Sequence, residues 1–400
     1  MYKMPEIPRL ANIKFLTLAS PLTAHDNHRT FALAMSNWPF NTTKSPSGRF
    51  TIFSPVPWKK SGAFGSVMPA RDESSGQDIA IKTADMSNPT NAKIAYDEAQ
   101  LALTLPQHPN VVHYLACEQT PERVLIAMEL GVGDDLFDLI ERQQNTDVAE
   151  MQRLAQQIIE GLEHLHSANV CHLDIKPDNM ILGADGNWKH CDFGTASRGK
   201  MQQVSKGTGF YMAPELGPAY SVAATFDGFA ADCFSLGVSI YLLLTSNFPF
   251  MEHQQRGSDA RSHCALRAQQ AGKSTSVALL TQLRMGAPAW PQSLLHLVDG
   301  FLLFDPSKRL GLADAKKLLR GEKPSLINRI FHFRSAGDDD DDDEEEEEGE
   351  VPPPIAAKRC RAKTAKPHAE WADAAADGGD GEAKPEEAAA GEAVAKGKAK

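Results

Sequence analysis

The 400-residue sequence lacks the cysteine patterns that hold structural zinc sites or disulfide frameworks together. Its six cysteines occur singly, with no C-x-x-C pair and no Cys/His spacing typical of a metal-ligand set. This pattern argues against both kinds of site and favours a reducing, intracellular compartment.

A continuous apolar run of about 18 residues, the length that a membrane span needs, is also missing. The first 20 residues contain two prolines and no apolar centre of a secretory signal. Tyr2 after Met1 excludes N-myristoylation, and the last four residues contain no cysteine for prenylation. We therefore expect no membrane association and a cytoplasmic or nuclear protein, or one found in both places.

Most of the chain carries no net charge. The formal charge is −11, and residues 338–400, with 9 Lys/Arg and 20 Asp/Glu, account for all of it. The neutral remainder argues against a nucleic-acid-binding surface. Residues 338–348 are all acidic, so we expect residues 336–400 to form a disordered tail whose charge suits basic partner proteins. KRCRAK at 358–363 is a candidate nuclear-import sequence.

The order of the periodic patterns predicts an α+β fold with two unequal lobes. Strand patterns occur between residues 50 and 82 and again in VVHYLA and RVLIAMEL, with a helical stretch at 92–105. After residue 149 the patterns are helical, and FAADCFSLGVSIYLLLTS is apolar nearly all round, as a buried helix would be. We expect residues 1–50 to be a loosely structured extension and the Gln/Ser/Ala/Arg-rich residues 252–287 to be a mobile insertion.

The clearest chemical signal is HLDIKPDNMIL at 172–182, followed by CDFG at 191–194. Asn179 and Asp192 supply oxygen atoms at the two ends of an expected β-hairpin, and such ligands suit a hard cation such as Mg²⁺. Asp174 is then available to accept a hydroxyl proton, and Lys176 to neutralise a phosphoryl oxygen.

This constellation resembles the eukaryotic-type protein kinase catalytic domain over about residues 51–335. The resemblance implies a protein-kinase-like fold with an N-lobe at about 51–130 and a C-lobe at about 131–335. It also implies a serine/threonine protein kinase that uses ATP and Mg²⁺, with Ser/Thr hydroxyls of proteins as acceptors. In this family Asp174 would be the catalytic base, Lys176 would stabilise the transferring phosphoryl group, and Asn179 and Asp192 would hold the metal.

The nucleotide-binding residues are implied by the same resemblance. SGAFGSV at 61–67 is similar to the later part of the glycine-rich loop, although Lys60 stands where the family has its first glycine. Lys82 in IAIK would contact the ATP phosphates and pair with Glu98, and VLIAMELGVGDD would supply the adenine pocket and a ribose contact. The implied set is Gly62, Gly65, Val67, Lys82, Glu98, Met128, Glu129, Gly131 and Asp135.

GTGFYMAPE at 207–215 resembles the substrate-binding P+1 loop of serine/threonine kinases. Thr208 would hydrogen-bond Asp174 and Lys176, and Glu215 would form a buried ion pair with Arg309. Asp232 would anchor the backbone of the catalytic loop, and Phe234 takes the place of the commoner tryptophan.

Leu173 departs from the family, which usually has arginine before the catalytic aspartate to pair with a phosphorylated residue. With a short segment from Asp192 to Glu215, this departure suggests activity without phosphorylation at Thr195, Ser197 or Ser205. The departures are also similar to those of divergent kinases of large DNA viruses. Asp178 is compatible with arginine-flanked substrates and equally with an ordinary solvated loop residue.

Two alternatives stay open at this point. A pseudokinase would bind ATP and partners without phosphoryl transfer, but its marks would be losses at Lys82, Asp174 or Asp192, and all three are present. A small-molecule kinase shares the fold but usually lacks a sequence such as GTGFYMAPE.

Overall fold

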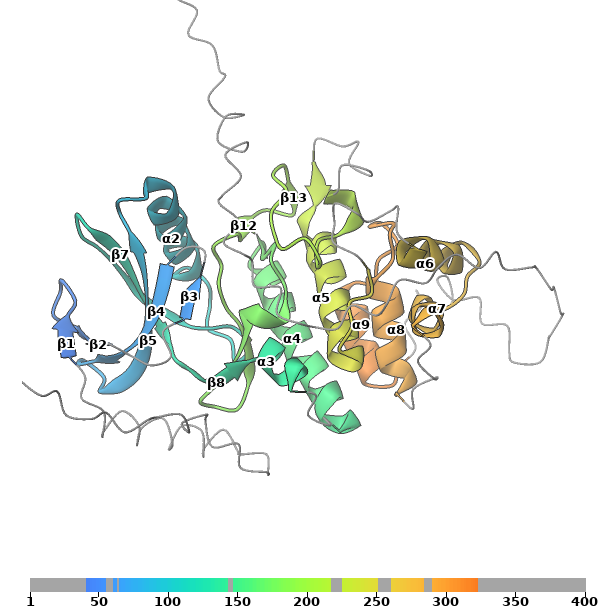
Figure 1. Cartoon of the computed structure of the whole chain (residues 1–400), viewed down its shortest axis with the longest axis horizontal. Coiled ribbons are helices and arrows are strands. Elements are labelled where there is room, and N and C mark those ends of the chain that lie inside the picture. The colour runs from blue at the N-terminus through green and yellow to red at the C-terminus, as the bar shows by residue number, and fades with distance from the viewer. Residues whose placement is uncertain are drawn as a thin grey trace, which may run out of the picture. The chain divides into compact units, whose positions relative to one another are not determined.

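The computed structural model describes residues 41–54, 60–62, 65–142, 147–216, 225–250, 260–283 and 290–322. The predictions for residues 1–40 and for the acidic tail, including KRCRAK, lie outside these residues. Within them, an antiparallel sheet with one helix precedes a mainly helical part, which confirms the α+β, two-lobed fold (Figure 1).

The N-lobe is built on an antiparallel sheet in the order β1-β2-β4-β5-β7-β6, with β3 paired to β4. Helix α2 (Pro89–Ala102) packs against β5, β6 and β7. An apolar cluster that includes Phe50 and Ile52 fills the opposite face of the sheet. The strands are β1 (Asn41–Lys44), β2 (Phe50–Ser54), β3 (Lys60–Gly62), β4 (Gly65–Asp72), β5 (Gln77–Asp85), β6 (Tyr114–Gln119) and β7 (Arg123–Glu129).

The sheet begins earlier than the sequence predicts. Strand β1 pairs with β2 from Asn41↔Ser54 to Lys44↔Thr51, inside the stretch expected to be a loose extension. All four of its residues, NTTK, are exposed. A polar edge strand of this kind has no apolar alternation, so its sequence carries no strand signal.

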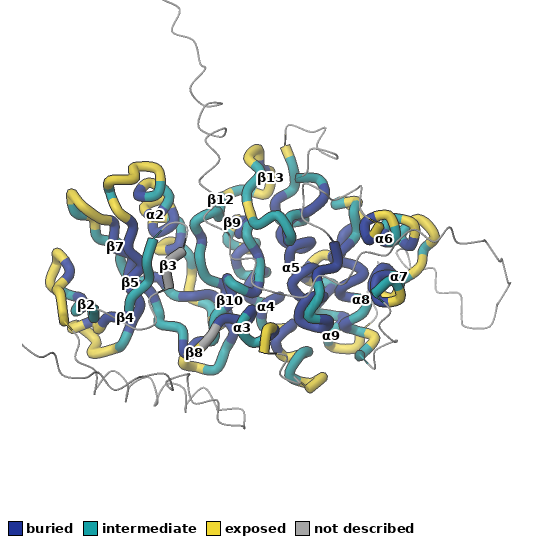
Figure 2. The backbone as a smooth tube through the Cα atoms, viewed as in Figure 1, coloured by how far each residue is buried: buried dark blue, intermediate teal, exposed yellow. Residues whose placement is uncertain are grey.

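The C-lobe is organised around two long helices. Helix α4 (Val148–Ser167) starts at its N-cap Asp147, and the predicted stripe of Leu154, Ile158, Leu162 and Leu165 is fully buried. Helix α5 (Gly228–Thr245) follows the short strand β14 (Phe226–Asp227) and is buried along most of its length (Figure 2).

Helix α5 is long and apolar enough to cross a membrane by length and composition alone. However, 83% of that 18-residue window is buried inside the protein, as expected for the core helix of a globular lobe. The hydroxyls of Ser239 and Thr245 donate to carbonyls four residues earlier, so these buried polar groups are satisfied within the helix.

The prediction of a mobile insertion at 252–287 is wrong for its folded part. Residues 260–270 form α6 and residues 275–282 form α7, which pack against each other. Arg261 is buried and donates to the Phe248 carbonyl at 3.0 Å. Helix α6 buries small residues such as Ala265 and Ala268, so its sequence looks too polar for a core helix.

The remaining elements position the chemistry or complete the helical core. They are β8 (Gly131–Asp135), α3 (Leu136–Glu141), β9 (Val170–Cys171), η1 (Pro177–Asn179), β10 (Met180–Gly183), β11 (Trp188–His190), β12 (Ser197–Arg198), β13 (Met201–Gln202), η2 (Pro214–Leu216), α8 (Gln292–Phe301) and α9 (Leu312–Leu319).

Candidate active site

Strand alternation on β5 turns Lys82 toward helix α2. Ala80, Lys82 and Ala84 share one face of the strand, and the two alanines belong to the core that includes α2. Ile79 and Ile81 point to the other face and its separate apolar cluster. The lysine therefore enters the interior from the same side as the helix that carries Glu98.

Lys82 joins two carboxylates from distant parts of the chain. Its Nζ lies 2.7 Å from Glu98 Oε2 and 2.8 Å from Asp192 Oδ1. The Tyr114 hydroxyl donates to the other Glu98 oxygen at 2.7 Å, which fixes a carboxylate that is almost fully buried. The predicted Lys82–Glu98 pair is present, and the bond to Asp192 connects it to the C-lobe.

The electrostatics keep this lysine charged. Burial by itself lowers the pKa of Lys82, but the carboxylates of Asp192 and Glu98 outweigh burial and hold the pKa above its ordinary value. A cation therefore persists at neutral pH in a place where an anionic phosphate can bind.

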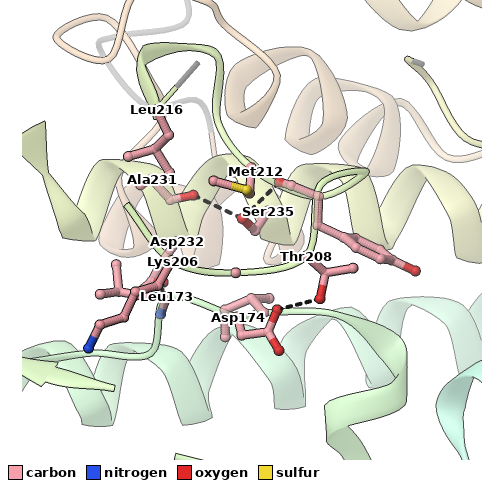
Figure 3. Close-up of a pocket in the computed structure, with 12 residues that line it drawn as sticks. Leu173, Asp174, Lys206, Thr208, Met212, Leu216, Ala231, Asp232 and Ser235 are labelled. Carbon is pink, nitrogen blue, oxygen red and sulfur yellow. Dashed lines mark hydrogen bonds between the residues drawn. The ribbon is translucent and has the colours of Figure 1, made fainter. Parts of the chain in front are cut away.

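Asp174, Lys176 and Thr208 form a closed triangle of hydrogen bonds. Lys176 Nζ lies 2.6 Å from Asp174 Oδ2 and 2.7 Å from Thr208 Oγ1, and Thr208 donates to Asp174 Oδ1 at 2.7 Å. Figure 3 shows the Thr208 hydroxyl pointing directly at the Asp174 carboxylate, and both residues line a small cavity of about 10 Å³. The bonds expected of Thr208 are therefore present.

The backbone before Asp174 is held by Asp232 of α5. The buried Asp232 carboxylate accepts from His172 N at 2.8 Å and from Leu173 N at 2.7 Å, and His166 Nε2 lies 3.0 Å from it. Leu173 has φ of 62°, which for a bulky side chain costs about 1–3 kcal/mol. Asp232 holds this backbone in place through the contacts that the resemblance implies, whereas the left-handed conformation of Leu173 was not predicted.

The catalytic loop is also tied to the segment that starts at Asp192. His172 Nε2 lies 3.1 Å from the Cys191 carbonyl oxygen, and Thr195 Oγ1 donates to the His172 carbonyl at 3.0 Å. These contacts fix Asp192 relative to Asp174 through the backbone on either side of both residues.

Asn179 and Asp192 stand at the two ends of the β10–β11 hairpin, as predicted. Cys191 N donates to the Asn179 carbonyl at 3.0 Å, which brings the residue before Asp192 against Asn179. The Asn179 amide donates to Asp174 Oδ2 at 3.1 Å. Its amide oxygen and the half-exposed Asp192 carboxylate are hard oxygen donors, and this donor set fits Mg²⁺.

Gly65 is the first residue of β4, and a residue with a Cβ does not fit at this position. A Cβ at this position would lie 2.0 Å from the Thr83 carbonyl oxygen, and its φ is +153°. Strand register pairs Gly62 with Gly65 and Lys60 with Val67, so the predicted glycine-rich hairpin is present at its base. Residues 63 and 64 at its tip lie outside the described residues.

The segment from Met128 to Gly131, here called the hinge, connects β7 to β8. Met128 is buried, and Glu129 N donates to the His113 carbonyl at 2.8 Å. A Cβ on Gly131 would lie 2.9 Å from Ile181 Cδ1, which requires glycine or a shift of that side chain. Adenine binding by this backbone stays a prediction.

Asp135 has a structural role that the sequence reading did not foresee. Its buried carboxylate accepts from Asp138 N at 2.9 Å and caps helix α3, and Asp138 reciprocates in a capping box. The ribose contact expected of Asp135 stays a prediction.

Lys189 of β11 connects the hinge to the C-lobe. The sequence did not predict a role for this residue either. Its Nζ lies 3.0 Å from Glu129 Oε1 and 3.0 Å from Asp185 Oδ2, and its side chain is 6% exposed. A cavity of about 690 Å³ lies beside this pair, and Lys82, Asp174 and Asp192 are not among its lining residues.

The predicted Glu215–Arg309 ion pair is bidentate. The two guanidinium nitrogens lie 2.7 and 3.0 Å from the Glu215 oxygens, and Arg309 also donates to the Ala230 carbonyl at 2.7 Å. The guanidinium carbon lies 5.0 Å from the centre of the Phe234 ring. This cluster fixes the end of the P+1 loop to the start of α5.

Residues 192–215, here called the activation segment, are held by backbone pairing with neighbouring strands. Strand β12 pairs with β9 and β13 pairs with β14. Lys200 Nζ lies 3.0 Å from Asp227 Oδ2, and Arg198 donates to the Thr104 hydroxyl just after α2. The Lys200 and Arg198 side chains thus add to the backbone pairing that anchors the segment.

Comparisons with known proteins agree with this geometry. The family model for the protein kinase domain matches residues 61–319. CBL-interacting protein kinase 8 of Oryza sativa subsp. japonica is 30% identical over 263 residues, which cover 64% of this chain and 54% of the relative. Mitosis inducer protein kinase cdr2 of Schizosaccharomyces pombe is 32% identical over 210 residues, 50% of this chain and 27% of the relative.

A third relative is CBL-interacting serine/threonine-protein kinase 24 of Arabidopsis thaliana, which is 30% identical over 200 residues, 48% of this chain and 43% of the relative. The chain thus spans about half or less of the length of these relatives. They are plant and yeast proteins and give no support to a resemblance to viral kinases. The matched domain, the two-lobed fold and the assembled motif residues show that the chain belongs to the eukaryotic-type protein kinase family.

Proposed function

We propose that the chain is an active serine/threonine protein kinase that transfers the γ-phosphoryl group of ATP to Ser/Thr hydroxyls of proteins. The observation that carries the proposal is the pair of contacts made by Lys82. Its bonds to Glu98 and Asp192 join helix α2 of the N-lobe to the start of the activation segment in the C-lobe. The name of the Arabidopsis thaliana relative, a serine/threonine-protein kinase, supports the serine/threonine specificity.

Each side chain has a role that its position supports. Asp174 accepts the proton of the acceptor hydroxyl, and Lys176, bonded to Asp174, offers its ammonium to the transferred group. The Thr208 hydroxyl accepts from Lys176 and donates to Asp174, which holds these two side chains in place. Lys82 orients the phosphates, and Asn179 and Asp192 would hold Mg²⁺, which when bound neutralises charge on the phosphates.

The pseudokinase alternative receives no support from the geometry. A module without chemistry has no need for Asp174, Lys176 and Asn179 to be hydrogen-bonded to one another, yet all three are. Leu173 stands where the family usually has a phosphate-binding arginine. The contacts of Asp232 to the backbone of the catalytic loop are nevertheless present. We therefore extend the proposal to activity without phosphorylation of the activation segment.

The test is incubation of the purified protein with labelled ATP, Mg²⁺ and a library of Ser-, Thr- and Tyr-containing peptides. Label on Ser and Thr peptides, absent when Asp174→Asn protein is used, supports the proposal. Label on no peptide, or equal label with both proteins, overturns it.

Phosphorylation independence has its own test. The double variant Ser197→Ala and Ser205→Ala should keep its turnover within about twofold, because the described contacts that anchor the segment use other side chains. Thr195 is kept in this variant, because its hydroxyl donates to the His172 carbonyl and its loss would remove an anchoring contact. A large fall in turnover, with folding unchanged, would refute this part of the proposal.

A further inference from the structure

Helix α2 packs against the sheet with little apolar bulk. Its fully buried residues are Ala92, Ala95, Glu98, Ala99 and Ala102, so one carboxylate lies among small methyl side chains. The hydrophobic stabilisation from a side chain grows with the apolar area that it buries, and alanine buries little. The position of α2 over the sheet therefore depends strongly on the polar bonds that Glu98 makes.

Both oxygens of the Glu98 carboxylate are bonded, and the two donors differ in kind. Lys82 lies 2.7 Å from Oε2 and belongs to the residues that would contact the phosphates. The Tyr114 hydroxyl donates to Oε1 at 2.7 Å and has no part in the proposed chemistry. Because Tyr114 and Glu98 are only 3% and 2% exposed, loss of the hydroxyl would leave a charged oxygen buried without this donor.

The ring of Tyr114 packs against the residue that follows Asp192. Its centroid lies 5.6 Å from that of the Phe193 ring, and the two rings are tilted by 52°. Tyr114 thus contacts Glu98 through its hydroxyl and the neighbour of Asp192 through its ring. Glu98 and Asp192 are the two carboxylates that Lys82 joins, so one side chain of β6 touches the supports of both.

We propose that Tyr114 is a positioning residue for phosphoryl transfer, whose hydroxyl holds Glu98 and helix α2 where Lys82 can orient the phosphates of ATP. The folded chain supplies this contact itself, from strand β6, and the contact needs no phosphate on the activation segment. Tyr114 acts on the reacting atoms only through Glu98 and Lys82. This inference rests on the proposed function.

The first experiment removes the hydroxyl and keeps the ring. In full-length Tyr114→Phe protein, kcat/KM for ATP should fall about tenfold, the effect expected for loss of a hydrogen bond to a buried charge, while KM for the peptide changes less than about twofold. Tyr241→Phe is the matched control and should keep wild-type rates, because its buried hydroxyl has no partner among the described residues. Equal kcat/KM values for Tyr114→Phe and wild type would overturn the proposal.

The second experiment tests whether the hydroxyl acts through Glu98. In Glu98→Ala protein the hydroxyl has lost its acceptor, so the addition of Tyr114→Phe should change kcat/KM for ATP by less than about twofold. A further tenfold fall in this background would show that Tyr114 affects transfer by another route and would refute the positioning role.

A third measurement does not depend on activity. Hydrogen exchange of the backbone amides in residues 89–102 should become at least about threefold faster in Tyr114→Phe protein, because α2 loses a bond that holds it, and exchange in α4 should change less. Tyr241→Phe should not speed the exchange of α2. If α2 exchanges at the wild-type rate in Tyr114→Phe protein, the proposal is wrong, even where the double variant is too slow to assay.

The inference and the kinase function fail in different ways. If the wild type labels the peptide library and Tyr114→Phe matches it in turnover and in α2 exchange, the inference is wrong and the kinase function stands. If the wild type labels nothing, the kinase function is wrong, and the exchange of α2 still shows whether Tyr114 holds the helix.

Discussion

Two buried tyrosines have hydroxyls in opposite situations. Tyr114 donates its hydroxyl to Glu98, whereas the Tyr241 hydroxyl on α5 has no hydrogen-bond partner among the described residues. An unpaired buried hydroxyl costs about 1–3 kcal/mol, so Tyr241→Phe should raise the free energy of unfolding by about 1 kcal/mol. Tyr114→Phe is the matched control and should lower it. Denaturant unfolding measures both, and destabilisation by Tyr241→Phe would contradict the assignment.

Asp299 on α8 provides a pH-dependent prediction. Burial raises the pKa of its carboxyl to about 6, although Ser274 Oγ and Ser276 N donate to it at 2.7 and 2.6 Å. Because the folded-state pKa exceeds the unfolded one, its contribution to stability is full below about pH 4 and is lost as pH rises through 6. The loss is about 3 kcal/mol for a shift of about two pKa units.

The Asp299→Asn variant tests this sign. Asparagine can accept from Ser276 N and donate to Ser274 Oγ without a charge, so the variant should gain stability relative to the wild type as pH rises from 4 to 7. Unfolding curves at several pH values measure the difference. A difference that stays constant across this range would refute the raised pKa.

At the level of single residues, the sequence predicts what a local motif encodes. Asp174, Lys176, Asn179 and Asp192 lie close in sequence, and their spacing sufficed to place them together. Tyr114 and His166 act through partners 16 and 66 residues away, and nothing in their own surroundings marks them. In the sequence Lys189 resembles an ordinary strand lysine, and only the fold shows that it lies beside Glu129.

At the level of elements, the hinge and the β10–β11 hairpin are joined by Lys189. Lys189→Met would leave Glu129 without its cation and loosen the hinge backbone that we expect to bind adenine. We expect the KM for ATP to rise several-fold with kcat nearly unchanged, because the residue does not contact Asp174. Lys189→Arg should restore most of the affinity. A fall in kcat with unchanged KM would contradict this role.

Element prediction succeeded where apolar periodicity is strong and failed where it is weak. Helices α4 and α5 and the central strands have clear patterns. Strand β1 is polar because it lies at an exposed edge, and α6 buries alanine and serine, which give no apolar stripe. In both failures the tertiary neighbours, and not the local sequence, determine the structure.

On the scale of the whole molecule, the Glu215–Arg309 pair connects the activation segment to the helical core. Arg309 is almost fully buried, so Glu215→Ala would leave an unpaired buried charge and should lower the free energy of unfolding by about 3–5 kcal/mol. Denaturant unfolding of the full chain measures this loss. A change below about 1 kcal/mol, as is usual for surface pairs, would show that the pair is not structural.

The fold class and the site were predictable together because the same motifs determine both. Lys82, Glu98 and Asp192 meet only if the sheet, α2 and the hairpin are arranged as in a kinase, so their contacts follow once that arrangement is recognised. The left-handed backbone of Leu173 and the anchoring of the activation segment were not predictable, since they depend on Asp232 and on strands that are distant in sequence.

The most direct measurement compares phosphoryl transfer and nucleotide affinity in wild-type and Asp174→Asn protein from parallel preparations. With Asp174 as the base, transfer should fall by about 10²–10⁴-fold while ATP affinity changes little, because Lys82, Glu98 and Asp192 keep their contacts. Equal transfer by the two proteins, or no transfer by the wild type despite ATP binding, would contradict the account.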